Sequence, residues 1–289
     1  MKNITKAVIP CGGMGTRFLP ITKAVPKEIL PVIDTPVLAY IVNEAIDSGI
    51  TDIMIVLGRG KEAIKQYFSP SPELEKTLEQ AGKLEFAEIV RKTYSRANIV
   101  FAYQEKPLGS GDAVMKAKEF TGNESFALAW GDDLIYSEKP VMSQLIAAHA
   151  QTGKSILGVQ TVNTDDIVKY GVAAVGNGNG RTYECTAIVE KPPLDKLPSR
   201  LAALGRYVLN PDVYDEIACL KPVKGGEIQF TDALNALCGK GEVCAYDFEG
   251  RRYDMGDKFG AIQATLEYGL RSKEYGGKLA AYLKKLAKA

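Results

Sequence analysis

Short apolar runs alternate with amphipathic segments through the first half of the chain. The apolar runs are rich in Ile, Val and Phe and have the length of buried strands. They are Lys6 to Cys11, Asp52 to Leu57, Asn98 to Tyr103 and Ser125 to Trp130. Two segments, Val37 to Ser48 and Met142 to Thr152, have apolar residues at helical spacing and end at a glycine, a common helix stop. This pattern predicts an α/β fold with a largely parallel, doubly wound sheet, whose ligands bind beyond the carboxyl ends of the strands.

The second half is richer in strands and less regular. Its candidate strands are Ser155 to Val162, Val172 to Val175, Glu184 to Glu190, Gly205 to Leu209 and Val243 to Phe248. The sequence GNGNG, which begins at Gly176, predicts a hairpin turn. From Lys258 onward the spacing becomes helical, and the last stretch, GGKLAAYLKKLAKA, is basic and amphipathic. A helix on a membrane surface is one interpretation, but a docking or subunit-contact helix is favoured because the apolar residues share one face.

Charge and cysteine content restrict the class of protein. The 289 residues include 36 Lys and Arg against 35 Asp and Glu, so no overall basic field would attract nucleic acid or an anionic membrane. The chain shows neither the apolar core of a signal peptide nor a run of the roughly eighteen apolar residues that a membrane span needs. The five cysteines form no C-x-x-C pair, which favours reduced thiols. We therefore expect a cytoplasmic protein with no nucleic-acid or membrane partner.

The most distinctive segment, PCGGMGTRFLPITKAVPKEILPVIDTP, follows the first predicted strand and runs from Pro10 to Pro36. Its glycines allow a tight turn that brings backbone N–H groups close to an anion, and three cations follow with no acidic residue between Thr16 and Lys27. The glycines and cations are Gly12, Gly13, Gly15, Arg17, Lys23 and Lys27. The segment therefore predicts a binding site for a polyphosphate.

Two familiar glycine motifs do not fit this segment. A dinucleotide fingerprint would need glycine at Phe18, and the P-loop pattern is absent from the chain. The glycines alone are equally compatible with a simple strand turn. However, Pro20, Pro26, Pro31 and Pro36 exclude a regular helix and stiffen the loop, and a long loop inside a compact domain is usually functional.

Two carboxylates follow the apolar run SFALAW, in the motif Gly131-Asp132-Asp133. Magnesium prefers hard oxygen ligands and usually takes one or two carboxylates together with substrate phosphates. An Asp pair can equally start a turn or cap a helix. The motif by itself leaves both interpretations open.

A carboxylate and a cation come together in the motif VEKP, where Glu190 and Lys191 end a predicted strand. Glu190 could accept hydrogen bonds from sugar hydroxyls while Lys191 neutralises the phosphate of a sugar 1-phosphate. The commoner alternative is a solvent-exposed ion pair that binds no ligand.

The segment GGMGTRFLPITKAVPKEILPVID resembles the signature of the sugar nucleotidylyltransferases, and among them the bacterial UTP-glucose-1-phosphate uridylyltransferases. The similarity covers essentially the whole chain, because further motifs occur in that family's order. They are GRGKEAI at Gly58, PELEKTLEQAGK at Pro72, YQEKPLGSGDAV at Tyr103, VEKP at Val189, GGEIQFTDAL at Gly225 and RYDMGDKFGAIQA at Arg252.

The resemblance implies a Rossmann-like α/β/α sandwich with a largely parallel mixed sheet and C-terminal helices. We expect a single nucleotidyltransferase domain over 1–289, with a nucleotide-binding half at 1–150 and a sugar-binding half at 151–257. The helical segment at 258–289 is expected to make subunit contacts in a homodimer or homotetramer.

The implied reaction joins UTP and glucose 1-phosphate to give UDP-glucose and pyrophosphate, with Mg²⁺, by in-line attack on the α-phosphorus. The same reaction with another pyrimidine nucleotide such as dTTP, or with another sugar 1-phosphate, is one alternative. A non-catalytic regulatory relative is another, although it would be expected to have lost a cation or a metal carboxylate. A dinucleotide-binding oxidoreductase is disfavoured by the missing third glycine.

The resemblance and the loop together assign roles to individual residues. Catalysis is assigned to Arg17, Lys27, Asp132 and Lys191; nucleotide binding to Gly12, Gly13, Gly15, Thr16, Glu28, Gln104 and Gly109; sugar binding to Gly171, Glu190 and Lys191; and Mg²⁺ to Asp132 and Asp254. Uracil and thymine have an N3–H donor that a Glu28 carboxylate could accept directly or through backbone and water, whereas cytosine has an acceptor there.

The chain departs from the family pattern on the nucleotide side. Where these uridylyltransferases commonly have PLGLGHA, this chain has PLGSGDA, so that Ser110 and Asp112 replace Leu and His. An acidic residue near a triphosphate is unexpected, and it leaves the base and phosphate contacts in this region open.

Overall fold

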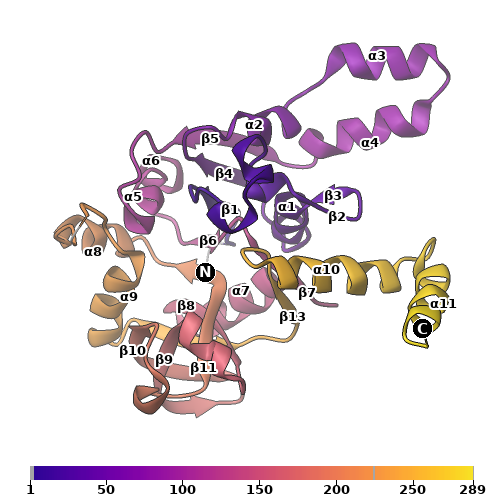
Figure 1. Ribbon diagram of the computed structural model, residues 1–289. Helices are drawn as coiled ribbons and strands as arrows, with labels where there is room; N and C mark the ends of the chain where they lie inside the picture. The colour runs from indigo at the N-terminus through magenta and orange to yellow at the C-terminus, as the bar shows by residue number, and fades with distance from the viewer. Residues whose placement is uncertain (1–2, 224, 289) are drawn as a thin grey trace.

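A nine-stranded mixed sheet forms the centre of the molecule, in the order β5-β4-β1-β6-β11-β8-β12-β10-β9 (Figure 1). The structure is a computed structural model that describes residues 3–223 and 225–288. Its strands are β1 Lys6–Cys11, β2 Pro31–Val32, β3 Thr35–Pro36, β4 Asp52–Leu57, β5 Asn98–Tyr103, β6 Phe126–Ala129, β7 Asp133–Tyr136, β8 Ser155–Thr161, β9 Gly171–Asn179, β10 Thr182–Glu190, β11 Leu201–Leu209, β12 Val243–Asp247 and β13 Arg251–Asp254.

Helices cover both faces of this sheet. They are α1 Val37–Asp47, α2 Glu62–Tyr67, α3 Pro72–Gln80, α4 Leu84–Ser95, α5 Ser110–Met115, α6 Lys118–Thr121, α7 Val141–Thr152, α8 Val213–Cys219, α9 Phe230–Gly239, α10 Lys258–Arg271 and α11 Gly276–Leu286. Alternate residues of β1 face opposite cores: Ile9 packs with residues of α1 and α7, whereas Val8 packs with residues of α5, α8 and α9. Because strand side chains alternate between faces, these two cores produce the predicted α/β/α sandwich.

Strand directions confirm the predicted largely parallel sheet. Strands β5, β4, β1 and β6 are mutually parallel, and β12 is parallel to β8. The antiparallel exceptions are β11, which lies between β6 and β8, and β10, which lies between β12 and the edge strand β9. The carboxyl ends of β1 and β6 therefore lie side by side, and the glycine loop and the GDD motif begin at these two ends.

Two strand predictions were too short. Strand β9 continues to Asn179 and turns at Gly180 and Arg181, whereas the sequence predicted a turn beginning at Gly176. Strand β11 begins at Leu201 rather than Gly205, and its register with β8 shifts between Ala203 and Tyr207. Glycine-rich strands are difficult to distinguish from turns, since glycine lacks the side chain that marks a strand's alternation and often lies at a bulge.

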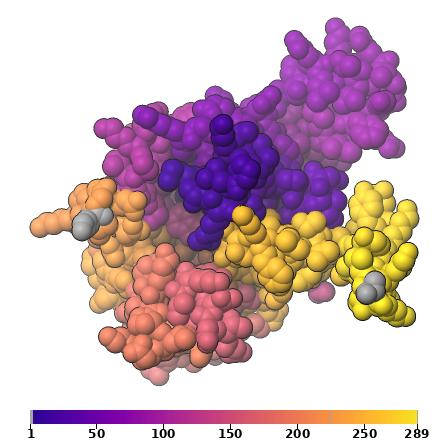
Figure 2. Space-filling view, viewed as in Figure 1, coloured from indigo at the N-terminus to yellow at the C-terminus, as the bar shows by residue number. Residues whose placement is uncertain are grey.

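The predicted α1, α7 and C-terminal helices are confirmed, but the sequence pattern did not predict the helical hairpin of α3 and α4. This hairpin stands away from the sheet (Figures 1 and 2). Its buried residues in the two helices are Glu75 and Ala87. Arg91 and Tyr94 of α4 hydrogen-bond to Glu75 of α3. Polar contacts to Glu75 therefore help to join the two helices.

Candidate active site

The glycine loop leaves the end of β1 and folds back on itself as three 3-10 turns, Thr16–Phe18, Ile21–Lys23 and Lys27–Ile29. The absence of an α-helix between Gly12 and Leu30 agrees with the predicted effect of the prolines. Gly15 adopts a left-handed backbone (φ 68°), and its carbonyl accepts a 2.8 Å hydrogen bond from Thr22 Oγ1. This folding returns Lys27 to the loop, with its Nζ 3.1 Å from the point where a Gly13 Cβ would lie.

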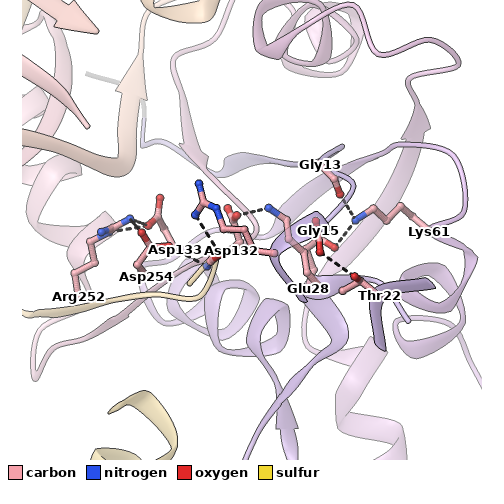
Figure 3. Close-up of polar contacts among 12 residues, drawn as sticks. Gly13, Gly15, Thr22, Glu28, Lys61, Asp132, Asp133, Arg252 and Asp254 are labelled. Carbon is pink, nitrogen blue, oxygen red and sulfur yellow. Dashed lines mark hydrogen bonds and ion pairs between the residues drawn. The ribbon is translucent and has the colours of Figure 1, made fainter. Parts of the chain in front are cut away.

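A buried ion pair between Lys61 and Glu28 contacts the glycine loop. Lys61 Nζ donates hydrogen bonds to Glu28 Oε2 (2.6 Å) and to the Gly13 carbonyl (2.8 Å), as Figure 3 shows. The Glu28 side chain is 1% exposed and that of Lys61 is 6% exposed. Glu28 therefore fixes the glycine loop through Lys61. Sequence reasoning noted the motif that contains Lys61 but did not assign this lysine a role, because its burial depends on the tertiary fold.

Lys27 and Asp132 form the central ion pair of the site. Lys27 comes from the glycine loop and Asp132 from the GDD motif after β6, so the parallel pairing of β1 and β6 brings them together. Burial alone would lower the pKa of the Lys27 ammonium, but the pairing with Asp132 and the nearby Glu28 outweigh it and raise the pKa. Lys27 is therefore fully charged at neutral pH.

Asp254 reaches the site through the two-stranded sheet of β7 and β13, in which it is the register partner of Asp133. Asp133 Oδ1 accepts a 2.7 Å hydrogen bond from Arg252 Nε (Figure 3). Arg252 also stacks over the Tyr170 ring at 4.6 Å. Burial raises the pKa of the Asp133 carboxyl despite its arginine partner. Asp133 thus joins the two strands, and it lines the same cavity as Asp132 and Asp254.

Three polar groups converge beside Gly256. A Cβ on this glycine would lie 3.0 Å from Asp254 Oδ1, 3.2 Å from Arg17 Nη1 and 3.7 Å from Asp132 Oδ2. Arg17 Nη1 donates to the Gly256 carbonyl at 3.1 Å. Carboxylate oxygens from two residues lie near one another beside the cations Arg17 and Lys27, and hard oxygen ligands of this kind fit the preferences of Mg²⁺. No cluster of three or more His, Cys, Asp or Glu suited to a metal occurs in 3–223 and 225–288, so substrate oxygens would have to complete the coordination.

Glu190 ends β10 and Lys191 follows it, and both line the same cavity as Asp132 and Asp254. Lys191 has a positive φ of 47° and its N–H donates to the Tyr170 carbonyl at 3.1 Å. A left-handed conformation costs a residue with a side chain roughly 1–3 kcal/mol and is concentrated at functional sites. Lys191 Nζ lies 3.5 Å from Glu190 Oε1, and a Gly171 Cβ would lie 3.2 Å from Glu190 Oε2.

Two adjoining pockets contain these groups. The larger has a volume of about 470 Å³ and the smaller about 330 Å³. Both are lined by Lys27, Ser110, Trp130 and Asp132. The larger adds Gly15, Thr16, Arg17, Gly171, Glu190, Lys191 and Asp254, and the smaller adds Gly12, Gly13, Glu28, Gln104 and Gly109. All the residues to which the sequence analysis assigned a catalytic, binding or metal role line one or both pockets. Lys23 is exposed and lines neither.

Sequence reasoning missed an aromatic group in the larger pocket. Trp130, Tyr207 and Phe230 pack edge to face, with ring centroids 5.3 to 6.0 Å apart. Trp130 Nε1 donates to Tyr207 Oη at 3.3 Å, and burial raises the pKa of the Tyr207 hydroxyl. Aromatic faces beside polar groups suit a sugar ring or a base. The chain's histidine, His149, lies on α7, where its Nδ1 is 2.8 Å from the Lys154 carbonyl.

Comparisons with known proteins match this chain to a family model, to relatives in sequence and to solved structures. A model of the nucleotidyl transferase family matches residues 6–269. UTP-glucose-1-phosphate uridylyltransferase 2 of Staphylococcus saprophyticus is 46% identical over 286 residues, which cover 99% of each chain. A UTP-bound UGPase from Acinetobacter baumannii is similar in structure, with a TM-score of 0.90 and 33% identity over 98% of this chain and 99% of the other. A UDP-glucose pyrophosphorylase complexed with UDP-glucose has a TM-score of 0.84 and 35% identity, covering 93% and 100%.

Proposed function

The chain belongs to the nucleotidyl transferase family, and we propose that it joins UTP and glucose 1-phosphate to form UDP-glucose and pyrophosphate. The observation that carries this proposal is the pair of pockets that share Lys27 and Asp132. A nucleotide base fits the smaller pocket and a sugar phosphate fits the larger, so the two substrates would meet at the shared residues.

The reaction is a single displacement. A phosphate oxygen of glucose 1-phosphate attacks the α-phosphorus of UTP, a new P–O bond forms, and the bond to the β-phosphate breaks to release pyrophosphate. The attacking oxygen is already anionic at neutral pH, so no general base is needed and the protein acts by positioning and charge neutralisation. The position of His149 on α7, bound to a backbone carbonyl, is compatible with this mechanism.

Cations on the glycine loop would neutralise the triphosphate. Lys27 is charged and 15% exposed at its side chain, and Arg17 lies beside the same point near Gly256. Backbone N–H groups of Gly12, Gly13 and Gly15 would add donors at close range. We assign Arg17 and Lys27 to the charge that develops on the departing pyrophosphate.

Asp132 and Asp254 would hold the magnesium ion, because their carboxylate oxygens lie near each other beside Gly256. When bound, the ion would supply positive charge that reduces the repulsion among the substrate phosphates. Arg252 and Asp133 would keep the two strands in register so that both ligands stay in place.

On the sugar side, Glu190 would accept hydrogen bonds from glucose hydroxyls and Lys191 would bind the sugar phosphate. Gly171 leaves room beside the Glu190 carboxylate. On the nucleotide side, Glu28 would act through Lys61 and Gly13, whereas the side chain of Gln104 and the backbone at Gly109 would face the base.

Assembly and location complete the proposal. Helix α11 extends away from the sheet at the end of α10 (Figure 1), with Tyr282 and Leu286 more than half exposed. We assign α10 and α11 to a subunit contact in a homodimer or homotetramer, which light scattering would test. None of the helices in the described part of the chain is long and apolar enough to cross a bilayer. All five cysteines are free thiols, which supports a location in the cytoplasm.

Pyrophosphate release tests the proposed function. Purified protein with Mg²⁺ and glucose 1-phosphate would be assayed with UTP, dTTP, CTP, ATP and GTP, and then with other sugar 1-phosphates. The fastest release is expected with UTP and glucose 1-phosphate. A preference for dTTP would keep the mechanism and change the substrate, and no release from folded protein that binds nucleotide would favour a non-catalytic relative.

A further inference from the structure

The amide of Gln104 is held in one orientation. Its Nε2 donates a 2.9 Å hydrogen bond to the Gly109 carbonyl and another of 2.9 Å to Asp112 Oδ2. Gly109 has a φ of 94°, and a Cβ there would meet the Ile228 carbonyl at 2.5 Å, so the loop that offers this carbonyl is itself closely packed. Both amide hydrogens of Gln104 therefore have protein acceptors.

The two acceptors make the reversed orientation unfavourable. A carboxylate is an acceptor without a donor when ionised, and a backbone carbonyl is an acceptor in any state. If the amide turned over, Gln104 Oε1 would face both of these oxygens, and two hydrogen bonds would become two repulsive contacts. A hydrogen bond to a charged group contributes more than a neutral one, so Asp112 strengthens the preference beyond what Gly109 alone provides.

Gln104 lines the smaller pocket, and its fixed orientation places Oε1 beside Gly12, another residue of that pocket. This oxygen lies 3.1 Å from the point where a Gly12 Cβ would be. Across 3–223 and 225–288, no group donates a hydrogen bond to it. The pocket thus offers a hydrogen-bond acceptor whose own protein partners do not satisfy it.

We propose that Asp112 is a positioning residue for base selection, which holds Gln104 so that Oε1 accepts the N3–H of uracil or thymine and rejects cytosine. Cytosine presents an acceptor at N3, and it would face Oε1 with no hydrogen between them. This inference rests on the proposed function, since it assumes that a pyrimidine nucleotide occupies the smaller pocket. A histidine, which is common at this position in the family that the chain resembles, could donate or accept, whereas an ionised Asp112 can only accept.

The surroundings of Asp112 also explain how an acid is tolerated on the nucleotide side. Its Oδ1 lies 3.5 Å from the Nζ of Lys116, the residue that follows α5. Asp112 is not among the residues that line either pocket. Its charge is therefore directed at Gln104 and Lys116 and away from the space for the triphosphate.

Equilibrium binding of UTP and CTP tests this inference without requiring turnover. Kd values would be measured by calorimetry with Mg²⁺ and no sugar phosphate, for the parental protein and for Asp112→Ala, Asp112→Asn and Lys116→Ala. We expect the parental protein to prefer UTP and Asp112→Ala to lose about tenfold of that preference, the factor expected for about 1.4 kcal/mol. Asp112→Asn should retain most of the preference, because its Oδ1 can still accept from Gln104. Lys116→Ala is the matched control and should bind as the parent does.

Three results would overturn the inference: a parental protein with no preference for UTP, an unchanged ratio in Asp112→Ala, or an equal loss of UTP and CTP affinity. The last would indicate a structural role. Thermal unfolding of each variant would establish that it is folded. A failure of the proposed function is distinguishable, because it would appear as absent pyrophosphate release from the parental protein whatever its binding ratio.

Discussion

Replacing Lys61 with methionine should both destabilise the protein and disorder its glycine loop. Lys61→Met keeps the length of the side chain but removes the charge that pairs with Glu28. The Glu28 side chain is 1% exposed, so its carboxylate would be left buried without a partner. Breaking a buried ion pair in this way costs about 3–5 kcal/mol. The same replacement also removes the hydrogen bond that Lys61 donates to the Gly13 carbonyl at 2.8 Å.

A double variant separates the ion pair from the rest of the effect. Glu28→Gln combined with Lys61→Met removes both charges, and the remaining loss is that of hydrogen bonds, about 1–2 kcal/mol. We therefore expect the double variant to be more stable than Lys61→Met alone. Lys92→Met is the matched control, because Lys92 also pairs with a glutamate, Glu88, but both side chains are about half exposed. Exposed pairs contribute about 0–1 kcal/mol.

Urea unfolding would give the free energy of unfolding of each variant, and UTP binding would report on the loop. We expect Lys61→Met to lower the free energy of unfolding strongly, the double variant to recover part of that loss and Lys92→Met to change it little. Folded Lys61→Met should also bind UTP more weakly. If Lys61→Met were as stable as Lys92→Met, the pair would not be buried in solution. If the double variant were less stable than Lys61→Met, charge pairing would not be the source of the loss.

Three further predictions concern single groups. Asp132→Asn should leave the protein folded but lower turnover by at least a hundredfold, because an amide is a poor magnesium ligand; unchanged turnover at saturating Mg²⁺ would remove Asp132 from the metal site. Lys191→Ala should raise KM for glucose 1-phosphate about tenfold or more, and a change confined to the KM of UTP would reverse the assignment of the two phosphates. Burial, and next the nearby Glu28, raise the pKa of the Cys11 thiol well above its ordinary value. In the folded protein this thiol should therefore stay protonated at pH 8.5. Because the unfolded chain loses this proton at the ordinary cysteine pKa, the protein should become less stable as the pH rises above that value. Iodoacetamide at that pH should modify the exposed Cys219 and leave Cys11 unmodified until urea is added, and peptide mapping that found Cys11 modified in folded protein would contradict its burial.

The parts of the fold and site that depend on local order could be predicted from the sequence. Strand β1 and its glycine loop, and strand β6 and its GDD motif, are continuous in the chain, so apolar runs followed by special residues indicated both. The parallel pairing of these strands then explains why Lys27 meets Asp132. Here the general rule that ligands bind beyond the carboxyl ends of parallel strands was sufficient.

Other parts depend on contacts between distant segments and could not be predicted from pattern. Asp254 lies beside Asp133 because β13 pairs with β7, and the sequence indicated Asp254 through family resemblance alone. In the sequence, Lys61 cannot be distinguished from a surface lysine, because its burial against Glu28 depends on how α2 packs. For Asp112, the sequence showed only a departure from the family pattern. The hydrogen bond that Asp112 accepts from Gln104 is the contact on which its proposed positioning role rests.

The formation of UDP-glucose itself is the most direct test of the account. UTP and glucose 1-phosphate would be mixed with the protein and Mg²⁺, and the reaction followed by phosphorus NMR. We expect the UTP signals to be replaced by those of UDP-glucose and pyrophosphate in equal amounts, and only when both substrates are present. Release of UMP, or an unchanged spectrum with folded protein that binds UTP, would contradict the transfer of a uridylyl group to glucose 1-phosphate.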